Sequence, residues 1–305
     1  MPSTKELKGR IRSVQDTRKI TNAMYLIAST KMRKAKAELD KTRPYFEAIK
    51  VEIKRIFRTV KSVQSHYFYP GESEPKLHGP YACLVITADK GLAGMYNQNV
   101  LKEAERMLQD HPDMKLFVVG EYGRQHFAQH KIKVERSFLY TAQNPTMQRA
   151  REISEILLDL FDSGKVHKIF VIYTDMKNGM TEEAKMARLL PFHRNTFVSN
   201  KVEKAVKLPF EFLPSVGEVL DNIIPSYVSG YIYSALVDSF CSEQNARMEA
   251  MNAAGDNADK ILANLSLAYN RQRQALITQE ITEISSGAKA QKRERQRKQE
   301  SEVRA

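Results

Sequence analysis

The residues best placed to do chemistry form a glycine-bearing turn, Asp89-Lys-Gly-Leu-Ala-Gly-Met-Tyr-Asn97, directly after an apolar run that predicts a strand. The carboxyl end of such a strand is where doubly wound folds bind ligands. Gly91 and Gly94 would allow a ligand close to the backbone, but they would equally allow a tight strand-to-helix connection. The turn lacks the Gly-x-Gly-x-x-Gly spacing of a dinucleotide site, so the sequence favours the connection and leaves a ligand site as the alternative.

Other catalytic and metal-binding patterns are missing from the sequence. There is no Gly-x-x-x-x-Gly-Lys-Ser/Thr loop, no Gly-x-Ser-x-Gly elbow and no His-Glu-x-x-His pair. The seven histidines share no spacing that suggests a metal. The two cysteines, Cys83 and Cys241, cannot form a disulfide framework, which favours a reducing compartment. We therefore expect no catalytic residue, no metal site and no cofactor.

Two further absences bear on location. The N-terminal residues have no apolar core after their positive charges, so we expect no signal peptide. The uncharged stretch from Ile223 to Val237 is interrupted by Pro225 and Gly230, and it is too short to span a bilayer.

The formal net charge of +12 lies mainly at the two ends of the chain. Residues 1–62 contain 17 lysines and arginines against 6 acidic residues, and residues 288–305 contain 7 against 3. Such a surplus suits nucleic acid, an anionic membrane surface or an acidic protein face. A purely solubilising face would be expected to contain acids that pair with its basic residues, and the first basic segment contains few. From charge alone, we weigh a solubilising face and a face for an acidic partner about evenly.

The first segment repeats with alternating steps of four and three, which predicts a coiled-coil helix from about Thr4 to about Val60. Its seam residues are Leu7, Ile11, Val14, Arg18, Thr21, Tyr25, Ala28, Met32, Ala35 and Leu39. Arg18 is a charge in the seam, so we expect it to meet a polar position of the facing helix. Pro44 should kink or restart the helix.

A second stripe of Ile20, Met24 and Ile27 lies beside this seam and indicates contact with something besides the partner helix. The segment from about Val216 to Gly287 predicts the second long helix, and because the chain leaves along one helix and returns along the other, the pair must be antiparallel. Its predicted seam comprises Arg247, Met251, Ala254, Ala258, Ile261, Leu265, Ala268, Gln272, Ala275, Gln279, Thr282 and Ser286. The seam becomes polar toward its end, which suits a hydrophobic dimer seam poorly.

The middle of the chain alternates β-rich apolar runs with helical patterns. The runs begin at Tyr81, Lys115 and Lys168, the helices cover about 97–110, 122–129 and 146–163, and an edge strand is expected over Val206 to Leu213. The predicted fold class is α/β: a long antiparallel two-helix coiled coil from the N- and C-terminal segments with an inserted doubly wound α/β domain. The expected boundaries are 1–62 and 214–290 for the coiled-coil helices, 78–213 for the Rossmann-like domain and 291–305 for a basic tail.

Four motifs support a family resemblance. They are the segments Thr17–Met24, Asp89–Asn97, Ser242–Met251 and Ile277–Ala290. Together they resemble the gamma subunit of F-type ATP synthase, bacterial type, in order and across nearly the whole chain. Two positions depart from the family's turn, Ala93 for a frequent Cys and Met95 for a Gly, and the chain runs about 15 residues past the C-terminal signature.

The resemblance implies a noncatalytic central-stalk rotor that couples ion-driven rotation of the membrane c-ring to conformational cycling of the catalytic beta subunits. It implies alpha, beta and epsilon subunits and the c-ring as partners, no nucleic acid, and a peripheral location on the cytoplasmic side of the cell membrane. Arg273, Gln274, Thr278 and Glu280 match positions that contact the beta-subunit catch loops. Met24, with Ile20 and Ile27, matches the surface near the acidic lever loop of beta.

Two other classes remain as alternatives. A basic coiled-coil protein that binds nucleic acid would associate tightly with duplex DNA and show a steep salt dependence. A small-molecule enzyme would need a ligand over the turn Asp89–Asn97, and a turn filled by side chains argues against it.

Overall fold

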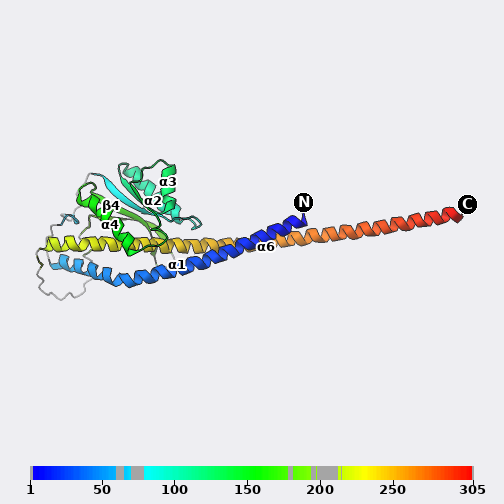
Figure 1. Ribbon diagram of the computed structural model, residues 1–305, viewed down its shortest axis with the longest axis horizontal. Coiled ribbons are helices and arrows are strands. Elements are labelled where there is room, and N and C mark those ends of the chain that lie inside the picture. The colour runs from blue at the N-terminus through cyan, green and yellow to red at the C-terminus, as the bar shows by residue number, and fades with distance from the viewer. Residues whose placement is uncertain are drawn as a thin grey trace. The chain divides into compact units, whose positions relative to one another are not determined.

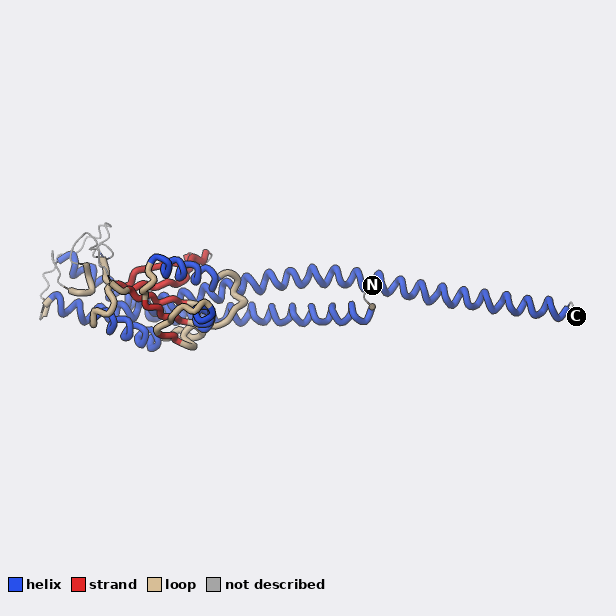
Figure 2. The backbone as a smooth tube through the Cα atoms, turned by 90° about the horizontal axis from the view of Figure 1, so that it is seen from above, coloured by secondary structure: helices blue, strands red, loops and turns tan. Residues whose placement is uncertain are grey.

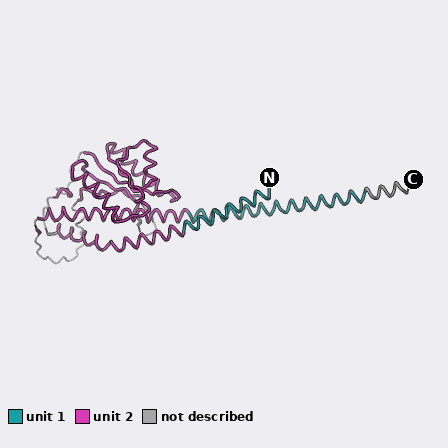
Figure 3. Tube along the Cα trace, viewed as in Figure 1, with its two compact units in different colours: residues 1–25, 251–305 teal, residues 26–250 magenta. Residues whose placement is uncertain are grey.

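The computed structural model describes residues 3–59, 65–69, 79–177, 181–193, 197, 212–213 and 215–303. Figure 1 shows the ribbon with its helices and strand β4 labelled, and Figure 2 shows the backbone coloured by element type. The chain divides into two compact units (Figure 3): residues 1–25 with 251–305, and residues 26–250.

Two long helices supply the ends of the chain: α1, Thr4–Thr59, and α6, Val216–Val303. The expected restart of the helix at Pro44 is wrong, because α1 runs through this proline as one helix. The expected kink stays a prediction. The division expected at residue 290 does not coincide with the end of α6. Its last residues are mainly Lys, Arg, Gln and Glu, which are good helix formers and carry the helix on to Val303.

The inserted domain contains a five-stranded sheet in the order β3-β2-β1-β4-β5. Its strands are β1 (Tyr81–Ile86), β2 (Lys115–Val119), β3 (Arg136–Phe138), β4 (Lys168–Lys177) and β5 (Thr181–Leu190). The first four are parallel and β5 is antiparallel to β4. Its shorter helices are α2 (Tyr96–Asp110), α3 (Glu121–Gln129) and α4 (Met147–Asp162). The predicted doubly wound fold is therefore confirmed.

The edge of the sheet next to β4 differs from the sequence prediction. The strand there is β5, which the apolar pattern did not predict. Of the edge strand expected over Val206 to Leu213, residues up to 211 lie outside the described residues. The described part, Phe212 and Leu213, is not in a strand.

Alternate residues of the strands face two different hydrophobic clusters. Cys83 and Val85 of β1 join the cluster that contains α2 and α3. Leu84 and Ile86 join the other cluster, which contains α4 and apolar residues of α1 and α6 from the same unit. Helices thus cover both faces of the sheet (Figure 1), which explains why β1 and β2 are apolar on both sides.

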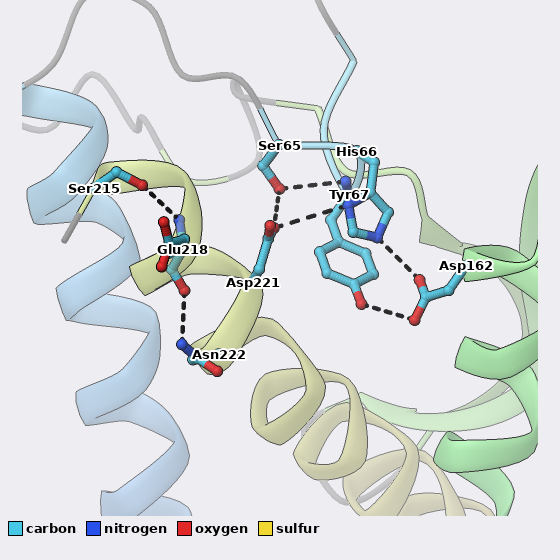
Figure 4. A network of polar contacts seen from close by, with 8 residues as sticks. All are labelled: Ser65, His66, Tyr67, Asp162, Ser215, Glu218, Asp221 and Asn222. Atoms are coloured by element: carbon cyan, nitrogen blue, oxygen red, sulfur yellow. Dashed lines mark hydrogen bonds and ion pairs between the residues drawn. The ribbon is translucent and has the colours of Figure 1, made fainter.

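A polar network fastens the short segment 65–69 to two helices (Figure 4). The Ser65 hydroxyl donates to Asp221 Oδ1 of α6 at 2.8 Å, and the Tyr67 hydroxyl donates to Asp162 Oδ2 of α4 at 3.1 Å. His66 lies between the two carboxylates, with Nε2 3.0 Å from Asp162 Oδ1 and Nδ1 3.9 Å from Asp221 Oδ1. Burial, followed by the charge of Asp162, raises the pKa of Tyr67. This network fixes the beginning of α6 against the inserted domain.

Candidate functional site

The seam predicted on α1 is the face of this helix that is buried. Leu7, Thr21, Ala28 and Leu39 are between 1% and 8% exposed. The intervening seam positions are partly buried, with the exception of Arg18. In the first unit this face packs along α6 (Figure 2), so the coiled coil predicted from the four-three pattern is confirmed.

The seam predicted on α6 is only partly right. Met251 and Ala258 are buried and Leu265 and Gln272 partly buried, as expected. Ile261, however, is 48% exposed and Ala268 is exposed, whereas their neighbours Leu262 and Tyr269 are partly buried. In each of the pairs Ile261–Leu262 and Ala268–Tyr269, the second residue faces the seam in place of the predicted first one.

Arg18, the charge in the seam, has the polar partner that the sequence led us to expect. Its Nε lies 2.8 Å from Asp259 Oδ1 of α6. Both side chains remain about half exposed, so the pair sits at the edge of the seam and contributes to register more than to stability. Beside it is a groove lined by Thr21, Tyr25 and Gly255, where small residues leave the two helices incompletely packed.

The register of this pair shows where α1 stops covering α6. Antiparallel helices rise equally per residue, so Arg18 opposite Asp259 places Thr4 opposite about residue 273. Residues 273–293 are all exposed. Among them Ile277, Ile281 and Ile284 are 47%, 61% and 73% exposed, which is unusual for isoleucines on an ordered helix. Nothing in the described part of the chain covers this end of α6.

The predicted partner-contact residues lie on accessible surfaces. Ile20 and Ile27 of α1 are 60% and 55% exposed, and Met24 between them is partly buried. The α6 positions are all exposed: Arg273, Gln274, Thr278 and Glu280. The Thr278 hydroxyl donates to the backbone carbonyl of Gln274 at 2.9 Å.

The turn Asp89–Asn97 docks against α6 in the second unit. Arg247 Nη2 donates to the Gly91 carbonyl at 3.1 Å and to the Lys90 carbonyl at 3.5 Å. Ala93 and Tyr96 pack with Ala88 and Ala246 in a small buried cluster. Gly94 and Leu92 have positive φ angles of 52° and 63°, so the glycine serves the turn itself. The turn at the carboxyl end of β1 is therefore held in contact with α6, which supports a structural connection.

Sequence reasoning missed the residue that fastens this turn. It assigned Arg247 to the coiled-coil seam, whereas Arg247 pairs with Glu243 one helical turn earlier at 2.6 Å. These side chains are only 11% and 8% exposed. Burial raises the pKa of Glu243, and the charge of Arg247 opposes this shift. An acid and a base four residues apart on one predicted helix were the signal for this pair.

Three further properties concern the ranges that the structure describes. Within these ranges no group of three or more His, Cys, Asp or Glu side chains could hold a metal ion. None of the described helices has an apolar stretch long enough to cross a membrane. Burial raises the pKa of the Cys83 thiol, so this cysteine is unreactive.

Fold and site together define a class of protein: an antiparallel pair of long helices that carries an inserted doubly wound domain and leaves the end of one helix uncovered. The sequence model of the ATP synthase family matches residues 3–291. The ATP synthase gamma chain of Acetivibrio thermocellus is 40% identical over 297 residues, covering 96% of this chain and 100% of the relative. That of Caldanaerobacter subterraneus is 43% identical over 287 residues, covering 92% and 97%. The chain belongs to the family of ATP synthase gamma chains, as the sequence motifs predicted.

Solved structures with the same fold agree with this assignment. The rotor of the Euglena gracilis mitochondrial ATP synthase superposes with a TM-score of 0.57 at 14% identity, covering 90% of this chain and 98% of that one. The central stalk and c-ring structure of the Tetrahymena thermophila enzyme gives 0.55 at 24% identity, covering 77% and 99%. At these identities the likeness concerns the fold.

Proposed function

We propose that this gamma chain is the noncatalytic central-stalk rotor of an F-type ATP synthase, coupling ion-driven rotation of the c-ring to conformational cycling of the catalytic beta subunits. The observation that carries the proposal is the uncovered end of α6, residues 273–293, on a chain whose family is that of gamma chains. An exposed helix with isoleucines along it needs a surrounding surface, and a ring of alpha and beta subunits would provide one.

The shape of the coiled coil suits this role. Its two helices differ in sequence, and α6 continues where α1 has ended, so the shaft presents different side chains in different directions. A shaft that contacts each surrounding subunit differently shifts the conformational equilibrium of each by a different amount. Such differential contact is the physical requirement for coupling between rotation and the catalytic sites.

The proposed contacts use both helices. Arg273, Gln274, Thr278 and Glu280 would meet the catch loops of beta, while Ile20, Met24 and Ile27 would meet its acidic lever loop. The surplus of positive charge on α1 is complementary to acidic loops, which favours a protein partner over nucleic acid. Epsilon and the c-ring complete the set of partners, and they place the chain peripherally on the cytoplasmic side of the cell membrane.

The test uses the reconstituted enzyme in membrane vesicles. We expect the double variant Arg273→Glu with Gln274→Ala to lower ATP-driven ion pumping several-fold, because a reversed charge would repel the loop that it now contacts. Arg271→Glu is the matched control, since it reverses a charge on the same exposed helix outside the assigned positions. Unchanged ion pumping in the double variant would show that Arg273 and Gln274 do not make the proposed contact with beta. Robust ATP hydrolysis by the pure isolated chain would remove the rotor proposal itself.

A further inference from the structure

A carboxylate of α6 lies where this helix packs on the sheet. Asp238 is partly buried and is one residue before Ser239, whose hydroxyl accepts a hydrogen bond from the Thr174 backbone N–H of β4 at 3.2 Å. Its closest polar partner is on its own helix, where the Ser234 hydroxyl donates to Asp238 Oδ2 over a long 3.4 Å. Asp238 therefore belongs to the junction that joins α6 to β4 in the second unit.

The charged groups around Asp238 come from α1, β4 and β5. Arg43 of α1 and Lys185 of β5 are the cations that act on it, and Asp175 of β4 is the nearby acid. Each cation is already paired with another carboxylate: Lys185 Nζ is 3.4 Å from Asp175 Oδ2, and Arg43 Nη1 is 3.3 Å from Asp40 Oδ1. Three carboxylates thus share two cations. In the described part of the chain Asp238 is the carboxylate of this group without an ion pair.

The remaining titratable neighbours are neutral at ordinary pH. Tyr173 of β4 and Tyr231 of α6 have pKa values raised chiefly by burial, and Asp238 contributes to both shifts. Burial, followed by the charge of Asp238, also raises the pKa of the Cys241 thiol to about 11. None of these groups can supply a positive charge, so the ionised form of Asp238 lies in a partly buried environment where both nearby cations are already paired with other carboxylates.

We propose that Asp238 is a proton-binding group built into the junction between α6 and the sheet, and that its protonation tightens the attachment of α6 to β4. A protonated, neutral Asp238 does not repel Asp175. The free-energy cost of keeping a charged carboxylate partly buried is also absent. The ionised carboxylate weakens the same junction. The attachment of the inserted domain to the long helix therefore responds to pH, a property separate from the contacts proposed for coupling.

The direction of the pH effect follows from proton binding. Burial, and after it the charge of Asp175, raise the pKa of Asp238 to about 6, while Ser234, Arg43 and Lys185 act in the opposite direction. An unfolded aspartate titrates near 4. The folded chain therefore holds this proton more tightly than the unfolded chain does, so its stabilising effect is present below about pH 4 and is lost as the pH rises through about 6.

The direct test is a titration of the full-length chain labelled with ¹³C at aspartate carboxyl carbons. We expect one carboxyl resonance with a midpoint near pH 6 in the wild type and its loss in Asp238→Asn. Asp256→Asn, which changes an exposed aspartate of the same helix, should leave that resonance in place. The proposal is overturned if the resonance lost in Asp238→Asn titrates near pH 4 with the ordinary aspartates.

A second measurement addresses the junction itself. Urea unfolding at pH 5 and pH 7.5 should show a lower midpoint at the higher pH for the wild type, and a smaller change for Asp238→Asn. If Asp238→Asn does not fold, Lys185→Met and Asp40→Asn replace it. The first removes a cation and should move the Asp238 midpoint upward, and the second frees Arg43 and should move it downward. A midpoint that moves in neither variant contradicts the proposed charge balance.

Discussion

Gly230 is the residue at which one additional carbon would most disturb the packing of α6. A Cβ atom there would lie 2.0 Å from Cδ1 of Phe46, a ring of α1 in the same unit. The ring sits against the glycine within the cluster that joins α1, α6 and the sheet, so it cannot swing away freely. The glycine that interrupts the apolar run of α6 is thus a packing requirement.

We expect Gly230→Ala to lower the free energy of unfolding by roughly 1–3 kcal/mol, the usual effect of overpacking a core. Gly255 of the same helix is the matched control, because a Cβ there meets nothing within 4 Å. Gly255→Ala should be neutral or stabilising by up to about 1 kcal/mol, since alanine is the better helix former. Urea denaturation of both variants checks this, and equal midpoints would contradict the packing argument.

Arg247 is the second position where a single residue decides an attachment. Arg247→Met would leave Glu243 buried without its ion pair and would free the carbonyls of Lys90 and Gly91. We expect a loss of roughly 3 kcal/mol, the usual cost of breaking a buried pair. The double variant Glu243→Gln with Arg247→Met should recover part of that loss, because it removes the uncompensated charge. A double-mutant cycle by urea unfolding measures the coupling, and additive effects would show that the pair is not the source.

At the scale of the elements, the sequence pattern predicts which helix residues are buried only where neighbouring residues differ in polarity. The seam of α1 could be predicted because residues such as Leu7 and Leu39 are flanked by charged neighbours. On α6 the neighbours Ile261 and Leu262 are both apolar, so the spacing alone could not choose between them. Only the packing of the two helices against each other decides which residue faces the seam.

The sheet shows the same limit. The parallel strands β1, β2 and β4 were predictable because they are apolar runs. The parallel strand β3 was not predicted, because its three residues, Arg136–Phe138, form no apolar run. The edge strand β5 carries Glu183, Lys185 and Arg188 among its residues, and charges on an edge strand hide it from a search for apolar runs. The Asn178-Gly179 dipeptide between β4 and β5 in the sequence is a hairpin signal that the apolar pattern does not include.

The sequence indicated which charged residues of the candidate site need a polar partner, but it did not identify every partner. Arg18 needed a polar partner and has Asp259. Arg247 was expected in the seam, and its actual partners are backbone carbonyls of a turn more than 150 residues away in the sequence. Contacts of this type depend on the tertiary arrangement, which no local spacing encodes.

At the scale of the whole chain, the sequence from residue 273 onward consists of two parts. Residues 273–291 lie within the match to the ATP synthase family and include exposed isoleucines. The residues from 292 onward lie beyond that match, and between Lys292 and Val303 the sequence contains no large apolar residue. A surrounding ring would gain apolar contact area from the first part and little from the second.

We therefore expect removal of residues 292–305 to leave assembly of the complex and ATP-driven ion pumping within about twofold of the wild type. Removal of residues 273–305 is the contrasting variant, because it also deletes Arg273, Gln274, Thr278 and Glu280. It should lower pumping by a larger factor, since the proposed contacts with beta are lost, while the coiled coil up to about residue 273 remains covered by α1. Native gel analysis of the assembled enzyme and fluorescence quenching in vesicles measure the two properties. If the shorter truncation alone prevented assembly, the basic residues at the end of α6 would have a partner of their own and would not be a solvated extension of the shaft.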